Sequence, residues 1–211
     1  MVAAFVGILP QLIVIAIVVV AAIWYRRPLA DVLQDRLAGF SAFGLRIDLK
    51  PREIVEAVKN RAERSPSGDR SAELDERVGA GIASRARRMA PQLVGRTILW
   101  VDDHPEWLVA ERALVRRLGM FVEPALDNEH ALDVLKRPNS DVDLVISDIR
   151  RDQGPPGTDL PALMPDKQMP VIFYVDRLEP GIPSGAFGIT NRPDELLQLI
   201  MDAAEGLPPR S

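Results

Sequence analysis

Ile98-Leu99-Trp100-Val101-Asp102-Asp103 is the stretch that decides the fold, because it is a short apolar run ending in two adjacent carboxylates. A second run of this kind, Leu144-Val145-Ile146-Ser147, leads directly into Asp148. Neither run alternates apolar with polar residues, which is typical of strands buried on both faces of a parallel sheet. Open α/β sheets bind their ligands at the carboxyl ends of such strands. The two runs therefore predict three carboxylates in one crevice.

Carboxylates gathered in this way raise one another's pKa unless a cation neutralises them. Oxygen ligands of this kind suit Mg²⁺. The alternative is that each Asp is only a helix cap or a turn residue, since Asp is common in both roles. Capping explains a single Asp more easily than the pair Asp102-Asp103 together with Asp148, so we predict a magnesium site.

Strand-like and helix-like segments alternate from residue 96 onward. Strands are predicted at 97–101, 121–126, 143–147, 171–175 and 186–190, and helices at 105–118, 128–136, 159–164 and 193–204. Trp107, Leu108, Leu114 and Leu118 are candidate core positions of the first of these helices. Five strands with interleaved helices predict an α/β fold with a doubly wound parallel sheet.

Composition narrows the function further. The length of 211 residues fits one ordinary domain and a smaller segment. The hydrophobic content of 47% is enough to form a core. The net charge of −4 gives no reason to expect a nucleic-acid partner. The absence of Cys excludes disulfides, thiolate metal sites and thiol nucleophiles. With only His104 and His130, zinc chemistry is not expected. His104 follows the acidic pair, so contact with the site is one interpretation, and a surface loop residue is the preferred one.

The N-terminal segment is predicted to be a membrane anchor, over residues 1–27. Residues 1–25 contain no charged side chain, which is long enough to cross about 30 Å of hydrocarbon as a helix. Trp24 and Tyr25 suit the membrane interface, and Arg26-Arg27 follow them on the expected cytoplasmic side. A signal peptide would carry its positive charge before the apolar core, and a buried core helix is the other alternative. We therefore expect a single-pass protein of the bacterial inner membrane.

Residues 28–95 are expected to connect the anchor to the sheet as a small α/β or helical connector. Residues 28–64 form a juxtamembrane segment of helix, short strand (44–50) and helix, the second helix running from Pro51 to Arg64. Residues 65–95 form a linker followed by a connector helix rich in charge. This helix is either a simple connector or a surface that pairs with a second copy of the chain, so a homodimer is one of the alternatives.

The segment from Arg96 to Glu205 resembles the receiver domain of two-component response regulators, which has a flavodoxin-like fold with strand order 2-1-3-4-5. The matching motifs are ILWVDD at 98–103, DLVISD at 143–148, PVIFYV at 170–175 and GAFGITNRP at 185–193. The resemblance implies a receiver-like domain over 96–206 with a tail at 207–211. It does not cover residues 1–95.

The resemblance also implies a role for each matching residue. Asp148 would be the phosphoacceptor, Asp103 would bind Mg²⁺ directly and Asp102 mainly through water. The main-chain carbonyl of Arg150 would supply another metal ligand. The phosphoryl group would come from a histidine kinase or another phosphodonor, and the chain would signal through protein contacts rather than act as an enzyme. No organic cofactor is expected.

Several positions depart from the family pattern. Val175 stands at the switch position, which usually holds Thr or Ser, and it has no hydroxyl to bind a phosphoryl oxygen. Arg192 replaces the usual Lys that contacts the phosphate, and Ile189 replaces the usual aromatic residue. Pro180 and Pro183 disfavour the fourth helix of the family.

These observations leave two principal functions. The first is a membrane-anchored receiver that accepts phosphate at Asp148. The second is a phosphorylation-independent pseudo-receiver that acts as an interaction scaffold at the membrane, which Val175 favours. A hydrolase is a third alternative, but the chain lacks a nucleophile elbow and a Gly-rich phosphate loop.

Overall fold

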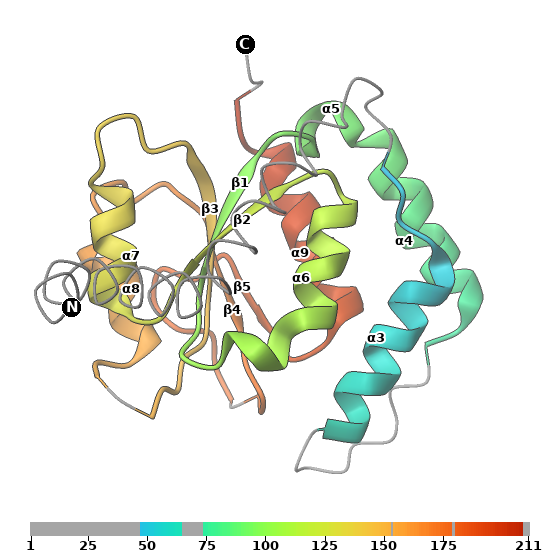
Figure 1. Cartoon of the computed structure of the whole chain (residues 1–211), viewed down its shortest axis with the longest axis horizontal. Coiled ribbons are helices and arrows are strands. Elements are labelled where there is room, and N and C mark those ends of the chain that lie inside the picture. The colour runs from blue at the N-terminus through green and yellow to red at the C-terminus, as the bar shows by residue number, and fades with distance from the viewer. Residues whose placement is uncertain (1–46, 65–73, 153, 179, 209–211) are drawn as a thin grey trace, which may run out of the picture. The chain divides into compact units, whose positions relative to one another are not determined.

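The computed structural model describes residues 47–64, 74–152, 154–178 and 180–208, which Figure 1 draws as a ribbon. The predicted anchor at 1–27 and the first predicted helix of the juxtamembrane segment lie outside the described residues. Within the described ranges, every helix is too short or too polar to span a membrane.

Five parallel strands form the central sheet in the order β2-β1-β3-β4-β5. They are β1 (Thr97–Val101), β2 (Phe121–Ala125), β3 (Val142–Ser147), β4 (Val171–Tyr174) and β5 (Gly188–Thr190). All five residues of β1 are buried, as expected for a strand with a neighbour on each side and helices on both faces. The predicted α/β class and the order 2-1-3-4-5 are confirmed.

Helices cover both faces of the sheet (Figure 1). On one face lie α6 (Val109–Arg117) and α9 (Pro193–Glu205), and on the other lie α7 (Asn128–Leu135) and α8 (Leu160–Leu163). Short 3₁₀ turns precede α6 and α8, η1 at Pro105–Leu108 and η2 at Gly157–Asp159. Alternate residues of each strand point to opposite faces, so Trp100 packs with the α6/α9 core while Leu99 and Val101 pack with the α7/α8 core.

The prediction that Trp107 belongs to the core is wrong, because 53% of its surface is exposed. The predicted helix at 105–118 begins as the 3₁₀ turn η1, which has 3.0 residues per turn. A projection at 3.6 residues per turn therefore misplaces the side chains of this first turn. Leu108, Leu114 and Leu118 are buried as predicted.

Of the two predicted forms of the connector, small α/β or helical, the described residues show the helical one. Its helices are α3 (Pro51–Arg64), α4 (Glu76–Arg88) and the short α5 (Ala90–Leu93). Ile54 of α3 and Ile82 of α4 belong to the same hydrophobic core as Trp100 and Leu196 of α9. Helices α3 and α4 thus form an outer layer over α6 and α9 (Figure 1). The boundaries at 64 and 95 stay predictions.

The predicted short strand at 44–50 is not found over its described part, residues 47–50. Ile47 and Leu49 are buried, whereas Asp48 and Lys50 are exposed. The alternation of apolar and charged residues is therefore real. It arises from an irregular segment whose apolar side chains pack into the core between the sheet and the helices, and which pairs with no strand among the described residues.

The described residues between β4 and β5, 175–178 and 180–187, contain no helix. This agrees with the prediction from Pro180 and Pro183 that the fourth helix would be disfavoured. The result is an open, irregular segment beside the carboxyl ends of the strands.

Candidate functional site

The predicted acidic residues surround one cavity at the carboxyl ends of β1 and β3. The register places Val101 opposite Ser147, so the residues that follow these two strands emerge side by side. The cavity has a volume of about 180 Å³. Its lining includes the predicted residues Asp102, Asp103, Asp148 and Arg150, and also Arg61, His104, Trp107, Leu108, Asp152, Tyr174 and Asp176.

Backbone amides hold the three predicted carboxylates in place. Asp102 Oδ1 accepts a hydrogen bond of 2.7 Å from the amide of His104, and Asp148 Oδ1 accepts one of 2.8 Å from Ile149. Asp103 Oδ2 accepts a hydrogen bond of 2.8 Å from the amide of Asp152. Asp102 therefore does form a turn of the kind first considered as an alternative, and it still lines the cavity.

Burial and crowding raise the pKa of Asp148 to about 7, burial being the larger cause and the charge of Asp102 the next. Burial also raises the pKa of Asp102, against the opposing effect of its bond to the His104 amide. Near neutral pH the Asp148 carboxyl therefore holds its proton far more readily than an ordinary Asp does in the absence of a cation. A bound cation would restore the carboxylate form.

A hard divalent cation fits this donor set, since Asp102, Asp103 and Asp148 present carboxylate oxygens to one cavity. A partly different group is also compatible with a metal, because ligand atoms of Asp103, His104 and Asp152 lie within 4.8 Å of one another. Asp103 is common to both groups. An acidic cluster suited to Mg²⁺ is therefore present at the predicted edge of the sheet.

His104 is not an isolated surface residue. Its Nε2 lies 3.0 Å from Asp152 Oδ2 and its Nδ1 lies 3.3 Å from Glu106 Oε1. Its ring stacks on Trp107 with 4.0 Å between the ring centroids. The hydrogen bond to Asp152 is the main cause that raises the pKa of His104.

Val175, at the predicted switch position, lines a second and larger cavity of about 550 Å³. Asp148, Arg150 and Asp176 line this cavity as well, together with Ile182 and other residues of the irregular segment before β5. The Val175 amide donates a 3.0 Å hydrogen bond to the carbonyl of Thr190. The larger cavity therefore lies between Asp148 and the irregular segment that precedes β5.

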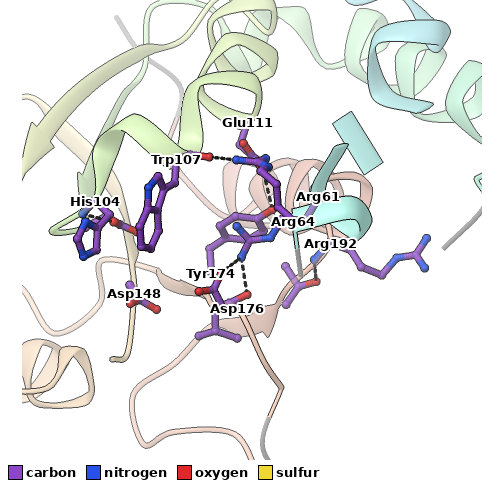
Figure 2. Close-up of polar contacts among 12 residues, drawn as sticks. Arg61, Arg64, His104, Trp107, Glu111, Asp148, Tyr174, Asp176 and Arg192 are labelled. Atoms are coloured by element: carbon purple, nitrogen blue, oxygen red, sulfur yellow. Dashed lines mark hydrogen bonds and ion pairs between the residues drawn. The ribbon is translucent and has the colours of Figure 1, made fainter. Parts of the chain in front are cut away.

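Arg192 is directed toward its own helix. Its Nε and Nη2 donate hydrogen bonds of 3.1 and 2.9 Å to the two carboxylate oxygens of Asp194. It lines neither the 180 Å³ nor the 550 Å³ cavity. Figure 2 shows its guanidinium extending away from Asp148.

Sequence reasoning missed Arg61 and Arg64, which α3 brings to the site (Figure 2). Arg61 Nη2 donates to Asp176 Oδ1 at 2.7 Å and to the carbonyl of Val175 at 2.9 Å. Arg64 donates to the carbonyl of Trp107 and, at 3.1 Å, to Glu111 Oε1. The sequence feature that could have revealed them is their spacing of three residues, which places both arginines on the same face of α3.

No protein-family model matches the chain, and no curated protein matches it. Solved structures that are similar to it include response-regulator receiver domains. The response regulator receiver protein from Sinorhizobium medicae is 21% identical over 53% of this chain and 96% of its own, with a TM-score of 0.46. The response regulator TrrA from Thermotoga maritima, in complex with Mg²⁺ and beryllofluoride, is 23% identical over 51% of this chain and 98% of its own, with a TM-score of 0.46.

The non-phosphorylated receiver domain of HemR from Leptospira biflexa is 24% identical over 55% of this chain and 99% of its own, with a TM-score of 0.45. These likenesses concern the fold alone. The parallel sheet of this chain, in the order β2-β1-β3-β4-β5, is itself receiver-like.

Proposed function

We propose that this chain is a receiver-type signalling protein that accepts a phosphoryl group on Asp148. The observation that carries the proposal is the position of Asp148, which follows a central buried strand and shares a cavity with Asp102 and Asp103. Mg²⁺ held by Asp103, Asp148, the Arg150 carbonyl and, through water, Asp102 would neutralise charge on the phosphoryl oxygens.

The transfer follows ordinary phosphoryl chemistry. A carboxylate oxygen of Asp148 forms a bond to phosphorus, while the bond from phosphorus to the donor breaks and its electron pair leaves with the donor atom. That atom is a nitrogen in a phosphohistidine of a histidine kinase, or an oxygen in a small acyl phosphate. Water later cleaves the acyl phosphate, which releases inorganic phosphate and regenerates the carboxylate. The signal is therefore transient.

The proposal includes attachment to the membrane through residues 1–27, which rests on the apolar sequence before Arg26-Arg27. Carbonate extraction of membranes tests this part. The protein should remain in the membrane pellet, and its release into the supernatant would exclude integral insertion.

A second candidate is a pseudo-receiver that works as a scaffold without phosphorylation. Two observations favour it. Val175 offers no hydroxyl at the switch position, and Arg192 is engaged with Asp194. The contact of Arg192 with a phosphoryl group stays a prediction.

Intact mass spectrometry separates the two candidates. The full chain is incubated with acetyl phosphate and Mg²⁺, and Asp148→Asn is treated in parallel. A receiver gains the mass of one phosphoryl group and the variant does not. A wild-type chain whose mass stays unchanged favours the scaffold.

A further inference from the structure

The cavity that holds Asp148 also receives a cation from outside the α/β sheet. Arg61 of α3 lines the 180 Å³ cavity together with Asp102, Asp103 and Asp148. Only 11% of its side-chain surface is exposed. The helical connector thus places an arginine in the acidic crevice. This arginine lies on α3, which is separated in sequence from the first strand of the sheet by α4 and α5.

Three contacts fix the guanidinium of Arg61. It donates to the Val175 carbonyl at 2.9 Å and to Asp176 Oδ1 at 2.7 Å, and its Cζ lies 4.8 Å from the ring centroid of Tyr174. The charge of Asp176 is felt at Asp148, where it contributes to raising the pKa. Arg61 therefore pairs with a carboxylate that lies near the phosphoacceptor itself.

The structural alternative is that Arg61 only attaches α3 to the sheet. Arg64, three residues later on the same helix, already does this through Glu111 and the Trp107 carbonyl. Arg64 does not line the 180 Å³ cavity, whereas Arg61 does. The two arginines thus make comparable attachments, but only one of them faces the acidic crevice.

Other arginines near Asp148 are placed less favourably. Arg192 is paired with Asp194 and points away from Asp148. Arg151 donates to Ser147 Oγ at 2.8 Å and to Asn128 Oδ1 at 2.6 Å, and it does not line the 180 Å³ cavity. Arg150 lines that cavity as well, but its side chain is exposed, whereas only 11% of the Arg61 side-chain surface is.

We propose that Arg61 is the cation that contacts the phosphoryl group on Asp148, an inference that rests on the proposed function. A phosphoryl group brings about two negative charges and three acceptor oxygens, which match the planar donors of a guanidinium. Arg61 would exchange its bond to Asp176, whose side chain is 64% exposed, for bonds to these oxygens. The state of Asp148 is then sensed directly by α3.

Beryllofluoride with Mg²⁺ is the probe, and its affinity for the detergent-solubilised full chain is measured by titration calorimetry. Losing a charge-assisted hydrogen bond should weaken binding by about tenfold or more in Arg61→Gln. Arg61→Lys keeps the charge but loses the planar set of guanidinium donors, so it should bind more tightly than Arg61→Gln and more weakly than wild type. Arg64→Ala is the matched control, because it weakens the attachment of α3 outside the cavity, and it should bind within about twofold of wild type.

Each outcome is decisive. If wild type does not bind beryllofluoride, the proposed function and this inference both fail. If wild type and Arg61→Gln bind equally, the function stands and the inference is wrong. Equal weakening in Arg61→Gln and Arg64→Ala would assign Arg61 to attachment alone. A loss of binding in Arg192→Gln but not in Arg61→Gln would give the contact to Arg192.

Discussion

Arg64 of α3 lies 3.1 Å from Oε1 of Glu111, a carboxylate whose side chain has no exposed surface. The same oxygen accepts a 3.2 Å hydrogen bond from the Tyr174 hydroxyl, while Oε2 has no hydrogen-bond partner among the described residues. Burial, with the Glu111 charge beside it, raises the pKa of Tyr174 well above its usual range. This network joins α3, α6 and β4 directly behind the candidate site.

Arg64→Ala should lower the free energy of unfolding by about 1–3 kcal/mol, because it leaves the buried Glu111 charge without its cation. Denaturant unfolding measures the change. Adding Glu111→Gln to Arg64→Ala should recover part of the loss, since the amide needs no counter-charge. If the two substitutions prove additive, Arg64 and Glu111 are not coupled.

Ile54→Ala should cost about 2–5 kcal/mol, because Ile54 is fully buried in the core that α3 shares with the sheet. Val78→Ala, at a position that is 47% exposed, should change stability by less than about 0.5 kcal/mol. Both values come from denaturant unfolding monitored by circular dichroism. An unchanged midpoint for Ile54→Ala would mean that α3 folds apart from the sheet.

Gly157→Ala should displace Asp148, because a Cβ at this position would lie 1.8 Å from the Asp148 carbonyl oxygen. The expected cost is about 1–3 kcal/mol, together with slower phosphoryl uptake. Gly81→Ala is the control, since nothing lies within 4 Å of its added Cβ and it sits inside α4. That substitution should stabilise by about 0.5–1 kcal/mol. Equal behaviour of the two variants would contradict the close packing at Asp148.

Stability should depend on pH through Asp148 when no metal is present. Its pKa is about 7 in the folded chain and lower in the unfolded chain, so the folded state binds more protons between these values. The stabilising contribution is full below the unfolded pKa, near 3.8, and is lost as the pH rises through about 7. Asp148→Asn should flatten this fall in unfolding measurements from about pH 4 to about pH 8. Mg²⁺ should also reduce this fall in stability. If the free energy of unfolding of Asp148→Asn falls with pH as steeply as that of wild type, another titrating group is responsible.

The sheet was predictable because its central strands are apolar throughout and end abruptly in acid, which leaves little choice of strand or direction. The gathering of Asp102 and Asp148 around one cavity follows from the same fact, since parallel neighbours end at the same edge. Strand order came from the family resemblance and was confirmed.

Other features depend on packing that no local pattern encodes. Trp107 is exposed because a 3₁₀ turn replaces the first turn of a helix. Residues 47–50 alternate without a strand because Ile47 and Leu49 pack into the core that the sheet shares with its helices. Arg61 reaches Asp176 across 115 positions of sequence. Its contribution to the site depends on where α3 docks, which spacing within the helix does not reveal.

The central claim is that Asp148 is the phosphoacceptor, and borohydride reduction followed by peptide mass spectrometry tests it most directly. The full chain is treated with acetyl phosphate and Mg²⁺, and reduction converts a phosphorylated Asp into homoserine. We predict homoserine at position 148, dependent on Mg²⁺ and absent when the phosphodonor is omitted. Homoserine at another Asp, or at none while a control receiver is labelled, would contradict the account.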